Sequence, residues 1–339
     1  MSDINMPQVN VKNIAGTRKA AMPASVKPQL ATLVDAAPVG DQWLHELKFD
    51  GYRMLAFIQA GKVRFFSRNG KDWTSKFANL SKALTTLPLT NAILDGEVVV
   101  VDEKGNASFQ RLQQAMGTGS ATFVFHIFDV IYLDGFGLTS VPLIERKGVL
   151  EKLLSVDKTK GQLRYSDHVV GEGAQFFKQA CQYGIEGIVS KLADSPYEST
   201  RTKSWLKVKC NQRQEFVIVG YTPSKKAFPG FGSLILAVHD KGQLVYSGRV
   251  GTGFSIKQRL EIQKKLDDIA QPKMPFATKP KDPGLRDAHW AKPKLVAEVE
   301  FTEWTADGSV RHPSFKGLRA DKKATDVIRE AAVSVKPRR

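Results

Sequence analysis

The stretch that most restricts the fold is FVFHIFDVIYL, at residues 123–133. It is a largely apolar run rich in aromatic and β-branched residues, the types that favour strands. Such a run predicts a strand buried inside the protein. Apolar–polar alternation with a period of two residues predicts further strands at 43–49, 53–58 and 62–67. We therefore expect a sheet whose interior is covered by other elements.

Helices and strands follow one another irregularly in the first two thirds of the chain. The run AILDGEVVV at 92–100 predicts two strand segments broken at Asp95 and Gly96, because Asp-Gly is a turn signal. This irregular order favours an α+β fold over a doubly wound sheet. This part also has two predicted helices, at 144–155 and 172–183, and two predicted strands, at 185–191 and 204–209.

The length of 339 residues suggests two domains. Residues 1–25 are polar, lack periodicity and predict a flexible tail. The sequence NQRQ interrupts the apolar pattern at 210–214. We therefore expect a first domain at 26–210 and a second domain at 214–339.

The second domain has several strand patterns and one amphipathic helix, which favour a small β-barrel of the OB-fold type. The proline-rich segment 271–293 predicts a long loop that either clamps a ligand such as DNA or only connects strands. The predicted strands lie at 215–221, 233–239, 243–250 and 295–303, and the predicted helices at 255–270 and 321–333.

The formal charge is +16, from 50 Lys+Arg against 34 Asp+Glu. An excess of this size favours an anionic polymer as partner, with nucleic acid first. No apolar run is long enough to span a membrane, and the N-terminus lacks a secretory signal, so we expect a soluble cytoplasmic protein. Cys181 and Cys210 permit neither a disulfide framework nor a cysteine-rich zinc site, and we expect two buried thiols. The six histidines show no metal-binding spacing.

A candidate nucleophile lies in WLHELKFDGYR, at residues 43–53. Lys48 is flanked by Leu47 and Phe49 in a strand pattern, and a turn signal follows. An amine held against apolar neighbours loses hydration and can become a nucleophile. Taken alone, this pattern also fits a lysine that extends from an edge strand to solvent.

Three further features bear on Lys48. Glu97 follows a turn signal, where its carboxylate can face a cleft or bind a hard metal ion. Glu186 and Lys191 are five residues apart in one predicted strand, so regular geometry places them on opposite faces unless a bulge intervenes. Lys207 and Lys209 share one strand face and repel each other unless an anion such as a polyphosphate, or solvent, separates them. Together these features predict a nucleotide-binding cleft.

The motifs KFDG, DGE, EGIVSK, WLKVK and RHPSFKGLRADK occur in the order typical of covalent nucleotidyltransferases. The chain resembles ATP-dependent DNA ligases within that superfamily, and most closely the ligase component of bacterial DNA ligase D. The resemblance covers about residues 25 to 335. It implies a nucleotidyltransferase (adenylation) domain followed by a C-terminal OB-fold domain, joined near 210–214.

The resemblance also implies roles for individual residues. Lys48 would form a lysyl-AMP phosphoramide, with Phe128 stacked on the adenine, although Phe128 in its aromatic strand also fits a core position. Catalytic roles fall on Lys48, Lys207, Lys209, Arg311 and Lys322. Contacts to ATP fall on Glu46, Lys48, Arg53, Arg68, Glu97, Phe128, Glu186, Lys207, Lys209, Arg319 and Asp321. Mg²⁺ (or Mn²⁺) would be bound by Glu97 and Glu186, and DNA by Arg68, Lys191, Arg201, Lys203 and Arg213, next to Lys225 and Lys226.

The predicted function is therefore sealing of 5′-phosphate/3′-OH nicks in double-stranded DNA during repair, by a monomer near the nucleoid. NAD⁺ is disfavoured as donor, because the NAD-type ligases carry a four-cysteine zinc module that two cysteines cannot build. Two alternatives remain. One is an RNA ligase or capping guanylyltransferase, and the other is a non-catalytic OB-fold protein that binds nucleic acid.

Overall fold

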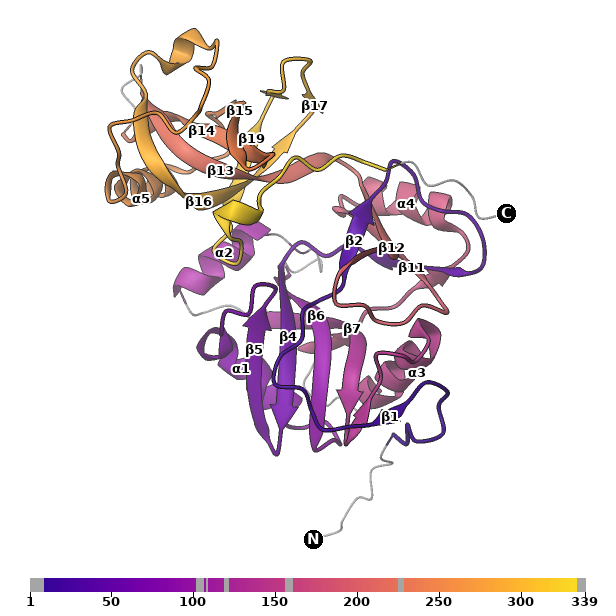
Figure 1. The fold of residues 1–339 in the computed structure, drawn as a ribbon. Helices are drawn as coiled ribbons and strands as arrows, with labels where there is room; N and C mark the ends of the chain where they lie inside the picture. The colour runs from indigo at the N-terminus through magenta and orange to yellow at the C-terminus, as the bar shows by residue number, and fades with distance from the viewer. Residues whose placement is uncertain are drawn as a thin grey trace. The chain divides into compact units, whose positions relative to one another are not determined.

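The computed structural model describes residues 9–101, 107, 109–118, 122–155, 161–224 and 229–333, so Lys225 and Lys226 fall outside the described residues. The chain divides into two compact units (Figure 1). The first unit comprises Met1–Cys210 and Ala332–Arg339, and the second comprises Asn211–Ala331. No helix within the described residues is long and apolar enough to cross a membrane.

The first unit is built on a large, mostly antiparallel sheet with the strand order β1-β8-β7-β6-β4-β5, in which β9 pairs with β7. Side chains of α1, α2 and α3 pack against one face of this sheet and form a single apolar core with it (Figure 1). Every residue of β7 is buried, which confirms the prediction from its composition. The bounds are β1 (Arg18–Lys19), β4 (Tyr52–Gln59), β5 (Lys62–Ser67), β6 (Asn91–Val100), β7 (Phe123–Leu133), β8 (Phe136–Gly137), β9 (Leu163–Tyr165), α1 (Ala78–Leu84), α2 (Phe109–Thr118) and α3 (Leu143–Leu154).

The predicted break at Asp95-Gly96 is wrong, because β6 runs through both residues. The pairing of β6 with β7 shifts register between them, so the dipeptide forms an irregularity inside one strand. A Cβ at Gly96 would lie 2.5 Å from the carbonyl oxygen of His126, and this close approach requires glycine.

The predicted flexible tail is also wrong for its described part, residues 9–25. Val11 is 3% exposed and lies in the apolar core of the first unit, with Ile14 packed against that core. Strand β1 pairs with β8. The segment contributes apolar side chains singly and without periodicity, so the pattern gave no sign of its packing.

A second sheet of the first unit has the order β10-β3-β11-β12-β2, with β2 parallel to β12. One face packs against α4 through a small apolar cluster that includes Trp43, Ala180 and Ile188. Trp205, on the opposite face, packs with Phe128 of the large sheet. The bounds are β2 (Leu30–Leu33), β3 (Trp43–Leu47), β10 (Val169–Val170), β11 (Gly187–Leu192), β12 (Arg201–Lys209) and α4 (Gly173–Gln182).

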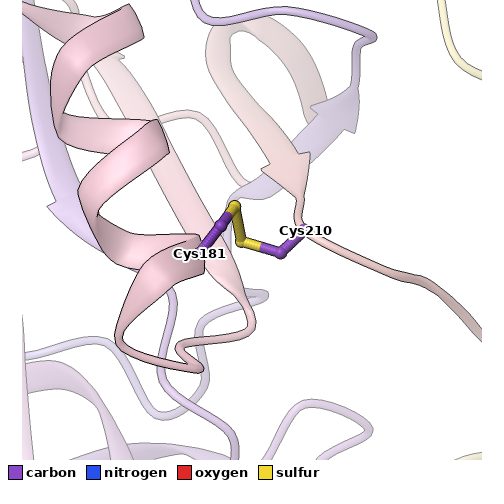
Figure 2. Close-up of a disulfide and its surroundings, with 2 residues drawn as sticks. All are labelled: Cys181 and Cys210. Atoms are coloured by element: carbon purple, nitrogen blue, oxygen red, sulfur yellow. A yellow bond between two sulfur atoms is a disulfide. The ribbon is translucent and has the colours of Figure 1, made fainter.

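The two cysteines are joined, which overturns the expectation of buried free thiols. Figure 2 shows Cys181 in the last turn of α4 and Cys210 just after β12. The S–S distance is 2.05 Å, and both residues are half-buried. The packing of α4 on the second sheet brings the cysteines together across 29 positions of sequence, which spacing alone does not reveal.

The second unit contains a sheet with the order β15-β14-β13-β16-β19 and a two-stranded sheet, β17-β18. Pairing among the described residues leaves the larger sheet open, so the expected barrel closure is not established. Helix α5 begins with a capping box, in which Ser255 and Gln258 exchange hydrogen bonds. The bounds are β13 (Gln212–Pro223), β14 (Phe231–Asp240), β15 (Gln243–Val250), β16 (His289–Phe301), β17 (Glu303–Trp304), β18 (Val310–Arg311), β19 (Ser314–Leu318) and α5 (Ile256–Asp267).

The predicted helix at 321–333 is wrong. Its described part holds only a 3₁₀ turn at Ala324–Asp326. The backbone N–H of His239 donates to the carbonyl of Val327 (2.8 Å), and Val327 is buried. This contact with β14 is non-local, and it keeps the chain extended where local propensity favours a helix. The proline-rich loop ends at residue 288, because β16 already begins at His289.

Candidate functional site

Lys48 follows the last residue of β3 and faces an acidic partner. Its Nζ lies 2.5 Å from Oε1 of Glu186, with the side chains 22% and 9% exposed. The backbone N–H of Lys48 donates to the carbonyl of Gly187 (2.9 Å), which fixes the end of β3 against β11. Strand β11 begins at Gly187, so Glu186 lies before the regular strand. This explains how Glu186 reaches Lys48 despite its odd spacing from Lys191.

The turn after Lys48 is anchored to the large sheet. The ring of Phe49 stacks on the imidazole of His126 in β7, with the centroids 3.9 Å apart. Oδ2 of Asp50 accepts a hydrogen bond from the backbone N–H of Phe109 at the start of α2 (3.2 Å). Burial lowers the pKa of His126 to about 4, so its ring is neutral at pH 7. These contacts hold the residues after Lys48 in one conformation.

The pairing register gathers cations on one face of the second sheet. Val189 of β11 lies opposite both Glu46 of β3 and Lys207 of β12. Residues directly opposite each other project to the same face, and the face alternates along each strand. The face that carries Lys207 also carries Glu46, Lys191 and Lys209.

Glu46 is the centre of a buried ion cluster. Nζ of Lys147 donates to its Oε1 (2.8 Å), and Nζ of Lys191 donates to its Oε2 (3.0 Å). The hydroxyl of Ser166 donates to Oε2 as well (2.9 Å). Burial alone would raise the pKa of Glu46, but the charges of the two lysines outweigh it and lower the pKa. The carboxylate is therefore ionised and fully hydrogen-bonded directly beside the Lys48 segment.

Lys191 is 2% exposed and lies against two aromatic rings. Its Nζ is 4.3 Å from the ring centroid of Phe128 and 4.2 Å from that of Trp205. Burial lowers the pKa of Lys191 to about 8, against the opposing charge of Glu46. Such burial does not fit the expected contact of Lys191 with DNA phosphates, which requires an exposed cation. Phe128 is 9% exposed and packs edge-on against Trp205.

Arg53 is held in a bidentate ion pair. Its Nε and Nη2 donate to the two carboxylate oxygens of Asp95 at 3.0 and 2.6 Å, and Nη1 donates to the carbonyl of Gln29 (2.6 Å). The hydroxyl of Tyr197 also donates to Asp95 (2.7 Å). Burial alone would lower the pKa of Arg53, but Asp95 outweighs it and raises the pKa. The guanidinium thus joins the two sheets of the first unit, whereas the sequence predicted a nucleotide contact.

Glu97 lies on the large sheet, opposite Arg53 on one side and His126 on the other, and is half-buried. Arg68 lies in the turn after β5 and is also half-buried. The described residues contain no group of three or more His, Cys, Asp or Glu placed to bind a metal. Mg²⁺ is commonly held by one or two carboxylates together with substrate phosphates, and the pair Glu97 and Glu186 fits that donor set.

In the second unit, most predicted site residues belong to a buried ion network. Arg319 donates to both carboxylate oxygens of Asp321 (2.8 Å each) and to Glu298 (2.7 Å). Lys322 pairs with Glu215 at 2.8 Å, and Arg213 with Glu298 at 2.9 Å. These pairs leave less of each cation available for the pyrophosphate or DNA than the sequence suggested.

Three other predicted site residues carry exposed positive charges. Arg311 is 56% exposed and pairs with Glu303 at 2.7 Å. Arg201 and Lys203 are exposed on β12, and Arg201 donates to the carbonyl of Ala31. These three side chains present charge to solvent, as a contact with a phosphate requires.

Sequence reasoning missed Lys147, although its position contained a signal. Lys147 lies on the same helical stripe as Leu143, Leu150 and Leu154 of α3, at spacings of four, three and seven residues. A lysine inside an apolar stripe predicts a buried charge, which in turn requires a carboxylate partner such as Glu46.

Comparison with known proteins identifies the family of this chain. The family described as “ATP dependent DNA ligase domain” matches residues 22–209, and that described as “ATP dependent DNA ligase C terminal region” matches residues 228–322. The multifunctional non-homologous end joining protein LigD of Pseudomonas aeruginosa is 38% identical over 95% of this chain and 38% of its own length. LigD of Mycobacterium tuberculosis H37Rv is 36% identical over 90% of this chain and 40% of its own. This chain thus spans about two fifths of these relatives.

A solved structure of mycobacterial DNA ligase D complexed with ATP and MES superposes with a TM-score of 0.67 and 34% identity. The match covers 90% of this chain and 98% of that one. Both units are therefore represented in a known ligase structure. The protein belongs to the family of ATP-dependent DNA ligases.

Proposed function

We propose that this chain seals nicks in double-stranded DNA through a covalent adenylate on Lys48. The observation that carries the proposal is the position of the Lys48 amine: it contacts Glu186, and the same sheet carries Lys207 and Lys209 on one face. The relatives named LigD act in non-homologous end joining by their names, and we extend that repair role to this chain. We expect it to act as a monomer in the cytoplasm, on DNA of the nucleoid.

The residues divide the first chemical step among them. The amine of Lys48 attacks the α-phosphorus of ATP, forms a P–N bond and releases pyrophosphate. Negative charge grows on the phosphoryl oxygens, where Lys207 and Lys209 provide fixed positive charge. Glu186 lies close enough to Lys48 to accept a proton from its ammonium group. AMP then passes to the 5′-phosphate, and the 3′-OH of the nick displaces it.

Glu97 and Glu186 would hold Mg²⁺ that arrives with ATP, and bound Mg²⁺ neutralises charge on the phosphates. Phe128 would stack on the adenine, and Glu46 would contact the base or ribose. Exposed cations on β12, Arg201 and Lys203, would contact DNA phosphates.

For the second unit we propose an OB-type barrel that closes over the nucleotide during adenylation. The proximity of β15 to β18 supports the barrel, because a Cβ built on Gly248 would lie 3.3 Å from the backbone nitrogen of Val310. Arg311 is an exposed cation there, suited to contact the departing pyrophosphate.

The test is covalent labelling with ATP carrying an α-phosphate label, followed by sealing of a nicked duplex. Wild type should acquire the label and seal the nick, whereas Lys48→Ala should do neither. Lys62→Ala, at an exposed lysine of β5, is the matched control and should behave as wild type. Labelling of Lys48→Ala at the wild-type rate would overturn the proposal. Label from GTP, or sealing of nicked RNA only, would favour the capping or RNA-ligase alternative.

A further inference from the structure

The disulfide lies at the point where the first unit ends. Strand β12 ends at Lys209 and β13 begins at Gln212, so only Cys210 and Asn211 lie between the last strand of one unit and the first strand of the other. Cys181, at the end of α4, is bonded to the first of these two residues (Figure 2). One covalent bond therefore ties the first residue of this joint to α4. The chain returns to the first unit at Ala332, where the backbone N–H of Val333 donates to the carbonyl of Leu33.

The same bond encloses part of the site. The backbone N–H of Cys210 donates to the carbonyl of Glu186 (3.0 Å), the residue that contacts Lys48. The segment between the cysteines includes β11 and β12 with Lys207 and Lys209. The joint is thus tied both to α4 and to the acidic partner of the nucleophile.

These two cysteines are the only ones in the chain, so the pair has no competing thiol within it. Both residues are half-buried, so neither is enclosed in the apolar core.

We propose that Cys181 and Cys210 form a reversible oxidation site that controls the freedom of the joint and, through it, the rate of ligation. The inference rests on the proposed function, because it assumes that residues 211–331 must move during the catalytic cycle. In the dithiol form both joint residues can absorb backbone rotation. In the disulfide form Cys210 is tethered to α4 and absorbs less of this rotation, so the movement of the second unit is slower.

The redox step needs a partner of the disulfide class. A low-molecular-weight disulfide accepts attack by one cysteine thiolate and releases one of its own thiols. The second cysteine then displaces the other thiol and closes the Cys181–Cys210 bond. Two protein thiols lose two electrons and two protons in total, and the incoming disulfide gains both. A dithiol reverses the sequence.

The test compares the full chain after treatment with oxidised glutathione and after treatment with dithiothreitol. Alkylation and mass measurement assign the thiol state, and nick sealing is measured at saturating ATP and DNA. We expect the reduced protein to turn over about fivefold faster or more, the lower end of typical coupling between sites. Cys181→Ser and Cys210→Ser should both match the reduced rate, with or without the oxidant.

Several results would overturn the redox site: equal rates in the two thiol states, no disulfide in the oxidised sample, or an equal response to oxidant in the serine variants. A change in melting temperature without a change in turnover would show a purely structural bond and would also overturn it. Failure of the proposed function looks different, since neither thiol state would then acquire label at Lys48 or seal DNA.

Discussion

Replacement of Lys191 by methionine tests whether burial dominates the energetics of the ion cluster of Glu46, Lys147 and Lys191. Lys191 is 2% exposed, and its pKa falls from the ordinary value of 10.5 to about 8. Glu46 keeps a donor on each oxygen in the variant, namely Lys147 on Oε1 and Ser166 on Oε2. Methionine can also fill the apolar space between the rings of Phe128 and Trp205. The substitution therefore removes one buried charge and leaves the remaining cluster paired.

The sign of the pH effect follows from the direction of the shift. Between pH 8 and 10.5 the unfolded chain keeps the Lys191 proton while the folded chain has lost it, so wild-type stability rises with pH in that window. The fall of the Lys191 pKa from 10.5 to about 8 corresponds to about 3 kcal/mol. The free energy of unfolding of wild type, relative to Lys191→Met, should therefore increase by about 3 kcal/mol from pH 7.5 to pH 10.5.

The assay is urea unfolding followed by tryptophan fluorescence at several pH values in this window. Lys203→Met, at an exposed lysine of β12, is the control and should run parallel to wild type. Parallel profiles of wild type and Lys191→Met would refute the reasoning, because they would mean that Lys191 keeps an ordinary affinity for its proton in the fold.

Four further variants address the other ion pairs. Lys147→Met leaves buried Glu46 with one lysine. Thermal unfolding should show that the free energy of unfolding falls by about 3 kcal/mol, the low end for a broken buried pair. An unchanged free energy of unfolding would mean that the pair is replaceable. Arg319→Met should cost the second unit about 3–5 kcal/mol, whereas Arg311→Met, at an exposed pair, should cost less than about 1 kcal/mol in the same experiment. Glu186→Gln should slow self-adenylation about 100-fold at unchanged fold, as measured by label transfer and circular dichroism; an unchanged rate would argue against a role for this carboxylate in activating the amine.

Most regular elements could be predicted because their information is local. Strand β7 has the bounds expected from its composition, and β15 has those expected from its alternation. Elements whose conformation depends on distant partners were missed. Residues 321–333 do not form the expected helix because Val327 is bonded to β14, and the segment around Val11 is ordered by the core it enters.

The sequence predicted which residues belong to the candidate site better than it predicted which ion pairs they form. The motifs identified Lys48, Lys207 and Lys209, and a period of two placed Lys207 and Lys209 on one strand face, which the register of β11 with β12 confirms. The partners of Arg53 and Lys191 were not predictable, because each lies on a neighbouring strand that is distant in sequence. Lys191 is buried at 2% exposure, whereas the side chain of Arg53 is 19% exposed and is bound to Asp95.

Arg53 and Lys191 also hold the two sheets of the first unit in place against each other. Arg53 projects from the large sheet and Lys191 from the second sheet, and each is tied to a carboxylate of its own sheet. Both cations lie over the same rings, those of Phe128 and Trp205, at centroid distances of 4.2 to 5.5 Å. The rings come from different sheets, so the stack joins the sheets through contacts that weaken steeply if either one slides. Lys48 directly follows β3 of the second sheet and Phe128 lies in the large sheet, and under the proposed function the attack on the α-phosphorus requires the two to keep their spacing. Removing the charges of Lys191 and Arg53 from water costs free energy. The contacts by which the two cations hold the sheets together offset that cost.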